Sequence, residues 1–197
     1  MRLNETMDTN GRNTGLYAVV IFLLIMGVTA GSVYLAKHST DMGEGIKNYI
    51  GSFFSSFAEN KNNMTVFKNS LTSNLISIGI IFVMGFFRFG CIATGAIIVR
   101  KGFIMGFTAA SFFKFYGLQG MLIMLSTMPT VLITIPALLF FSAVSVKFSL
   151  NPDKKQKKLI FSYIFLVILM VSIFCVASLS EGFLTTTFMS IISPKIN

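Results

Sequence analysis

Long apolar runs alternate with short polar segments along the whole chain. A helix rises 1.5 Å per residue, so about 20 apolar residues are needed to cross a hydrocarbon core of about 30 Å. The runs are continuous, whereas a transmembrane barrel would show alternating apolar and polar positions. The pattern therefore predicts an all-α, polytopic bundle of about five transmembrane helices in one membrane domain, 16–180, with spans at about 16–36, 71–87, 102–116, 118–146 and 159–180.

Two parts of this pattern are irregular. The apolar run 89–99 is closed by two cations and has only 11 residues, too few to cross a membrane alone. It predicts a short re-entrant or broken segment, and whether this segment crosses the membrane is left open. The run 118–146 contains Pro129 and Pro136, which are expected to kink or break its helix.

The segments outside the predicted spans are polar. Residues 1–15 form an N-terminal tail, and residues 181–197 form an external or interfacial C-terminal tail. The longest polar segment, 37–70, still carries apolar residues that share one helical face, Ile46, Tyr49, Ile50, Phe53, Phe54 and Phe57. This spacing predicts an amphipathic helix that lies on the bilayer surface or packs on the bundle.

Charge sets the predicted orientation. The chain has 16 Lys and Arg against 7 Asp and Glu, and its most basic loop, 147–158, is expected in the cytoplasm by the positive-inside rule. Counting back along the spans puts Arg88, Arg100 and Lys101 at the cytoplasmic membrane edge, the N-terminus inside and the C-terminus outside. Because the basic residues border apolar runs, the net charge of +9 indicates contact with membrane lipid and not with nucleic acid.

Candidate chemistry is sparse in this sequence. The seven acids lie in tails, loops or span ends, and His38 is the single histidine. Cys91 and Cys175 lie in apolar segments without the spacing of metal ligands. Neither a Gly-x-x-x-x-Gly-Lys-Ser/Thr phosphate loop nor a His-Glu-x-x-His metal motif is present. We therefore expect no catalytic residue, no cofactor and no metal site, and a chain that is not an enzyme.

A pair of small residues gives the sharpest local signal. Gly102 and Gly106 form a Gly-x-x-x-Gly pair within 101–108. Small residues at this spacing let another helix approach closely in a membrane. They predict tight helix packing at this point of the chain.

At this cluster the chain resembles the stage II sporulation protein M family. The shared features are a Lys-Gly-Phe-x-x-Gly-Phe-Thr pattern at 101–108, a polar glycine-containing turn at 117–120, and the spacing of Pro129 and Pro136 in a long apolar segment. The layout is also similar, with one N-terminal span, an outer segment containing a Phe-Phe pair, and four further membrane segments. The resemblance extends over about 16–181.

The resemblance implies a non-enzymatic scaffold in the membrane of a bacterium. Members of the family act in engulfment during sporulation, together with stage II sporulation proteins D and P, which degrade peptidoglycan at the septum. On this basis we expect the chain to anchor and localise these cell-wall hydrolases. The candidate contact residues are Phe53, Phe54 and Phe57 for an external partner and Gly102, Gly106 and Phe107 for helix packing.

A membrane permease subunit of a transporter is the alternative function. The short run 89–99 and the proline-containing run 118–146 are typical of the discontinuous helices of transporters. A transport pathway usually carries an ionisable residue inside a span, and the predicted spans offer no buried charge, which counts against this alternative. The identity of the partner and self-association as a homo-oligomer stay open.

Overall fold

The structure of the chain is a computed structural model that describes residues 2–59, 63–87, 89–151, 156–185 and 187. At some helical positions, including 49–59, it describes the backbone but not the side chain. The elements are α1 (Arg2–Glu59), α2 (Asn63–Gly85), α3 (Gly90–Leu150), α4 (Lys157–Ser180) and the short π-helix η1 (Glu181–Thr185). Within the described residues the fold is therefore all-α, as predicted.

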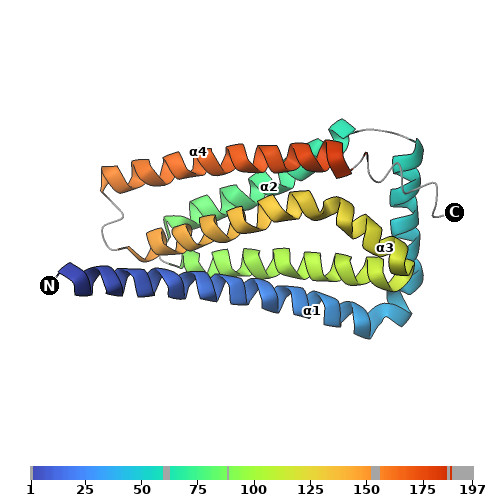
Figure 1. Cartoon of the computed structure of the whole chain (residues 1–197), viewed down its shortest axis with the longest axis horizontal. Coiled ribbons are helices and arrows are strands. Elements are labelled where there is room, and N and C mark those ends of the chain that lie inside the picture. Colours follow the sequence, from blue (N-terminus) through green and yellow to red (C-terminus); the bar gives the residue numbers. More distant parts are fainter. Residues whose placement is uncertain (1, 60–62, 88, 152–155, 186, 188–197) are drawn as a thin grey trace.

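Five helical stretches are long and apolar enough to cross a membrane. They run in alternating directions, so that α1 begins at one end of the bundle and α4 ends at the other (Figure 1). The predicted class, a polytopic bundle of about five spans, is confirmed. The run 89–99 is the first part of a longer helix and not a separate segment, because the helix continues without a break past the two cations. The five spans are Thr14–His38, Met64–Gly85, Gly90–Leu118, Met124–Leu150 and Lys157–Phe183.

Helix α3 supplies two of these spans because it reverses direction at Gly117. This glycine has φ 53° and ψ −126°, a conformation that residues with a Cβ atom avoid. At Gly120 an added Cβ would collide with the carbonyl oxygen of Phe112, so the two halves meet closely only because that position has no side chain. Pro129 and Pro136 lie inside the second half of α3, which Figure 1 shows as bent but not broken.

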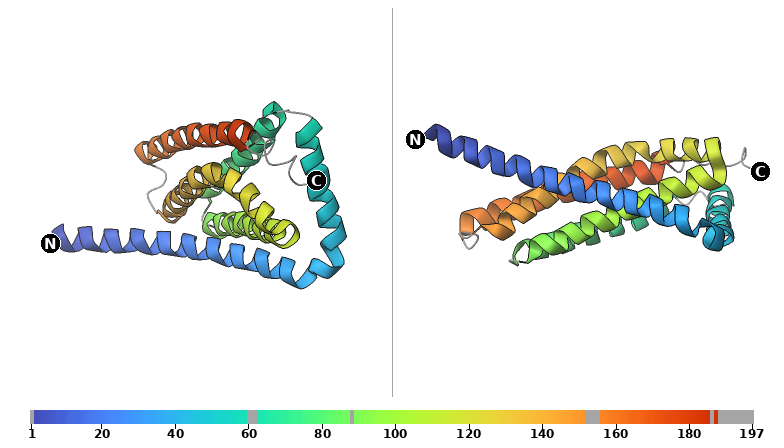
Figure 2. Two further views of the ribbon diagram at one scale, coloured as in Figure 1. Left: turned by 45° about the vertical axis from the view of Figure 1, so that its right-hand side comes forward. Right: turned by 90° about the horizontal axis from the view of Figure 1, so that it is seen from below.

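Helix α1 is much longer than the span it contains. Its last part, 39–59, turns across the end of the bundle at which α2 begins (Figure 2). The predicted amphipathic segment lies in this part, which we call the α1 extension. The helix ends at Glu59 and α2 begins at Asn63.

An aromatic core fixes the opposite end of the bundle, where α3 ends and α4 begins. Tyr163 is buried, and its ring stacks on Phe148 with 4.3 Å between the ring centroids. The Tyr163 hydroxyl donates to Ser145 Oγ over 3.1 Å, and Ser145 donates to the carbonyl oxygen of Ile81 over 3.0 Å. Because unpaired hydroxyl groups are costly in hydrocarbon, these bonds hold α2, α3 and α4 together at this end.

Candidate functional site

Gly102 and Gly106, the predicted packing pair, are buried on the side of α3 that faces α1. A Cβ atom at residue 102 would lie 2.5 Å from the carbonyl oxygen of Leu24 and 3.1 Å from the backbone nitrogen of Val28. A Cβ atom at residue 106 would collide with the backbone of Val28. These two positions therefore lie where the backbones of α3 and α1 touch, which larger side chains would prevent.

Helix α1 brings a second glycine pair to the same contact, which the sequence analysis did not single out. Gly27 and Gly31 are four residues apart, and a Cβ atom at either would collide with the backbone of α3. The hydroxyl of Ser32 on α1 donates to the carbonyl oxygen of Gly106 over 3.2 Å. Two facing small-x-x-x-small pairs thus join α1 to α3.

Phe107 lies half-buried beside this contact. Its ring centroid is 6.3 Å from that of Phe103 on the same helix and 6.5 Å from that of Tyr34 on α1. Centroid distances of 4.5–7 Å are typical of favourable aromatic pairs. Phe107 therefore belongs to the packing between α1 and α3.

The three residues proposed for external contact lie in the helical backbone of the α1 extension. Their side chains are outside the described residues, so their role in binding a partner stays a prediction. They are Phe53, Phe54 and Phe57.

A polar cluster lies where α2, α3 and the end of α4 meet. Lys101 Nζ donates to Asn74 Oδ1 over 3.1 Å, and Asn74 Nδ2 donates to Ser178 Oγ over 3.2 Å. The hydroxyl of Ser70 contacts Ser178 Oγ over 3.3 Å and donates a short hydrogen bond to the Glu181 carboxylate. A continuous chain of hydrogen bonds therefore links an ammonium group on α3 to a carboxylate at the junction of α4 and η1.

The cluster includes positions in the interior of candidate spans, although Glu181 lies near the end of Lys157–Phe183. Asn74 is near the middle of the span Met64–Gly85, and Lys101 is well inside Gly90–Leu118. The prediction that Arg100 and Lys101 lie at the cytoplasmic membrane edge is therefore wrong. The reason is that the apolar residues before the two cations and those after them form one helix, which places the charges in its interior.

Burial gives these polar groups a strong requirement for partners. Asn74 is only 5% exposed and Lys101 is half-buried. An ammonium group inside a bilayer costs several kcal/mol unless other groups compensate its charge. The nearby charges are the Glu181 carboxylate, which attracts Lys101, and the Arg100 guanidinium, which repels it. The cluster thus brings opposite charges together within the membrane and ties three helices to one another.

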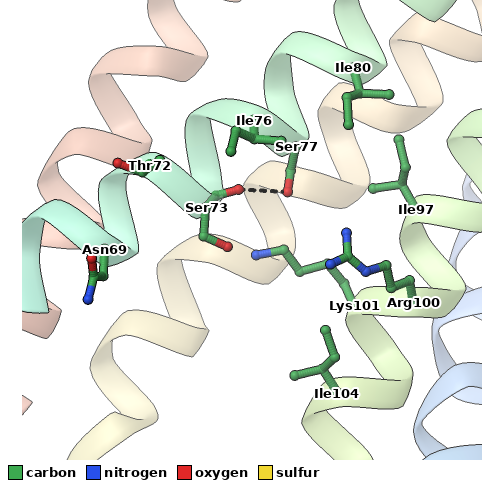
Figure 3. Close-up of a pocket in the computed structure, with 10 residues that line it drawn as sticks. All are labelled: Asn69, Thr72, Ser73, Ile76, Ser77, Ile80, Ile97, Arg100, Lys101 and Ile104. Atoms are coloured by element: carbon green, nitrogen blue, oxygen red, sulfur yellow. Dashed lines mark hydrogen bonds between the residues drawn. The ribbon is translucent and has the colours of Figure 1, made fainter.

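A groove lies beside the cluster, between α2 and α3. Its volume is about 510 Å³, and its lining includes Arg100 and Lys101 from α3 and Ser73 and Ser77 from α2. Figure 3 shows the side chains of Arg100, Lys101 and Ser73 pointing toward the same space. The arrangement can hold charge and can offer hydrogen-bond donors to a polar group in the groove. Among the residues that the structure describes, no three His, Cys, Asp or Glu side chains come together as metal ligands would.

The sequence analysis did not predict this cluster, whose members are Lys101, Asn74, Ser178, Ser70 and Glu181. A usable signal was present for Lys101, since joining the apolar runs on its two sides gives one helix long enough to cross the membrane with two cations in its interior. No comparable signal exists for Glu181. It contacts Ser70 from 111 positions away in the sequence, and only the packing of α4 on α2 brings the two together.

The fold and this cluster define a class: a multi-pass α-helical membrane protein with a charged, hydrogen-bonded site within its spans. A family model described as Stage II sporulation protein M matches residues 18–186. Because the match covers most of the chain, the protein belongs to the stage II sporulation protein M family and is a sporulation-related membrane protein. The resemblance seen in the sequence is confirmed. Searches of curated proteins and of solved structures gave no match.

Replacing Gly102 with Leu is expected to separate α1 from α3. The added side chain has no space against the backbone of Leu24 and Val28, and overpacking of this kind costs on the order of 1–3 kcal/mol of stability. Thermal unfolding of the purified protein in detergent micelles measures the loss. Gly79→Leu is the matched control, because a Cβ atom at Gly79 meets no atom within 4 Å. Equal unfolding temperatures for the two variants would contradict the proposed contact.

Replacing Asn74 with Leu is expected to destabilise the junction of α2, α3 and α4. The substitution removes the acceptor for Lys101 and the donor to Ser178, and an unsatisfied buried polar group costs about 1–3 kcal/mol. Asn69→Leu, an exposed position on the same helix, is the control and should change stability little. The same unfolding assay compares them, and a similar loss in both variants would show that the buried cluster contributes nothing specific.

Proposed function

We propose that the protein is a non-enzymatic membrane scaffold that anchors and localises peptidoglycan hydrolases during engulfment. The observation that carries this proposal is membership of the stage II sporulation protein M family over 18–186. Stage II sporulation proteins D and P are the proposed partners. A membrane-anchoring role is also consistent with where the residues lie, because most of the described residues belong to the five candidate spans.

The α1 extension is the proposed contact surface for these partners. It is the longest described part of the chain outside the candidate spans, and it is helical across the end of the bundle (Figures 1 and 2). Because the α1 extension continues directly from a membrane span, a partner protein bound to it would be held at a fixed place relative to that span. The aromatic residues Phe53, Phe54 and Phe57 would supply the apolar anchors typical of binding hot spots.

We further propose that the α1 extension faces outside and that the N-terminus lies in the cytoplasm. The support is the charge of the opposite end, where Lys147 ends the last turn of α3 and Lys157 begins α4. Clusters of Lys and Arg between spans favour the cytoplasmic side. The hydrolases act on peptidoglycan, so an external α1 extension would present them to their substrate.

Affinity purification of the tagged full-length protein from membranes of starved cells tests the scaffold role. The wild type is expected to recover peptidoglycan hydrolases, and a Phe53→Ser, Phe54→Ser, Phe57→Ser variant about tenfold less, because hot-spot aromatic residues carry much of a binding energy. The control is Phe87→Ser with Phe89→Ser, two exposed residues at the opposite end of the bundle.

Two outcomes of this experiment, and one observation in a strain that lacks the protein, would contradict the proposal. Recovery of an ATPase subunit in place of hydrolases would indicate a permease. Equal recovery by both phenylalanine variants would remove the α1 extension as the contact surface. Normal septal localisation of the hydrolases in a strain lacking this protein would show that it does not localise them.

Cysteine labelling tests the proposed orientation. With Cys91 and Cys175 replaced by Ala, a Thr65→Cys variant carries a thiol near the start of α2, and a Gln156→Cys variant carries one just before α4. A membrane-impermeant maleimide is expected to label the first in intact protoplasts and the second only after permeabilisation. The reverse pattern would show that the protein has the opposite orientation.

A further inference from the structure

The groove between α2 and α3 opens on the surface of the bundle and not into its interior. Ile76 is 55% exposed, and Ser73 and Arg100 are also exposed. All three line the groove, and all three lie inside candidate spans. Since the lipid phase surrounds this face of a membrane-embedded bundle, the groove opens toward lipid.

Arg100 has no compensating partner on the protein side. Its side chain makes no hydrogen bond or ion pair with the part of the chain that the structure describes, and its near neighbour Lys101 carries a charge of the same sign. A guanidinium group inside a span is costly unless it meets water, an anion or a lipid headgroup. An anionic group in the groove would remove this cost and supply the acceptors that Arg100 lacks.

Lys101 is directed toward the same space but is held differently. Its ammonium group donates to Asn74 Oδ1 over 3.1 Å, so it has further protons to donate. The hydroxyls of Ser73 and Ser77 line the groove as well. The Ser77 hydroxyl already donates to the carbonyl oxygen of Ser73 over 2.9 Å, so the Ser73 hydroxyl is the one left to donate. Two cations and this hydroxyl around one space match the oxygen atoms of a phosphate group, to which arginine binds in bidentate fashion and lysine as a point charge.

The groove is lined by both polar and apolar side chains of α2 and α3. Asn69 and Thr72 lie toward the beginning of the helix and Ile80 lies deeper in the span, where Ile97 of α3 also lines the groove. Ile104 lines the groove on the other side of the two cations (Figure 3), so apolar side chains flank Arg100 and Lys101 and can contact a hydrocarbon chain. A free phosphate ion would make no use of the isoleucines.

We propose that this groove binds the phosphate group of an anionic lipid, drawn below the headgroup level of the leaflet at the end of the bundle where α2 begins. Arg100 and Lys101 contact the phosphate, and the hydrocarbon chain lies along Ile76, Ile80 and Ile97. The site does not depend on the proposed scaffold role, so each can fail without the other.

Native mass spectrometry of the purified full-length protein, titrated with single lipids, measures this binding. Phosphatidylglycerol is expected to bind the wild type at least about tenfold more tightly than it binds Arg100→Gln, because a charge-assisted, bidentate contact is lost. Phosphatidylcholine, whose phosphate charge is compensated, should bind weakly to both. Lys114→Gln removes an exposed cation elsewhere on the same helix and should leave the affinity for phosphatidylglycerol unchanged.

A second variant keeps the test decisive if Arg100→Gln fails to fold. Ser73→Trp fills the exposed groove without changing any charge, and it should weaken phosphatidylglycerol binding by a similar factor. Equal affinity in the wild type and in every folded variant would overturn the proposal. Displacement of the bound lipid by millimolar inorganic phosphate would also overturn it, because the site would then recognise the free ion and not the lipid.

Discussion

An ammonium group inside a bilayer needs partners, and Lys101 lies inside a membrane span. The packing of three helices follows from this requirement. Asn74 of α2 accepts the hydrogen bond from Lys101, Ser178 of α4 accepts from Asn74, and Glu181 supplies the opposite charge. A shift of α4 along α2 would separate these groups and leave polar atoms unpaired, so the cluster fixes the register of the two helices.

The contact between α1 and α3 has a different physical basis. The two backbones meet there because Gly27 and Gly31 face Gly102 and Gly106. Lipid is as apolar as the helix surfaces, so close van der Waals contact and interhelical hydrogen bonds must supply the association. Since α1 continues into the α1 extension, the glycine contact also determines where that extension lies relative to the other helices.

The sequence was sufficient for features that depend on local periodicity. Run lengths predicted an all-α bundle of about five spans, and the spacing of Gly102 and Gly106 predicted a close helix contact where the structure has one. It was insufficient where the partner lies far along the chain. Gly27 and Gly31 also have the Gly-x-x-x-Gly spacing, but only the fold shows that they face the other pair. Lys101 was predicted at the membrane edge because a charged residue was assumed to end a span. A buried network of hydrogen bonds can instead hold a charged residue within a span.

The two ends of the bundle differ in chemistry, and this asymmetry bears on function. Aromatic residues and buried hydroxyls pack the helices around Tyr163 and Phe148, at the end that also carries Lys147 and Lys157. The beginning of α2 and the α1 extension lie at the other end (Figure 1), and the polar cluster joins α2 and α3 to the junction of α4 and η1. Charged and hydrogen-bonding groups are costly to keep in a membrane. Keeping the polar cluster inside the bundle therefore has a cost, which a ligand or partner at the cluster would offset.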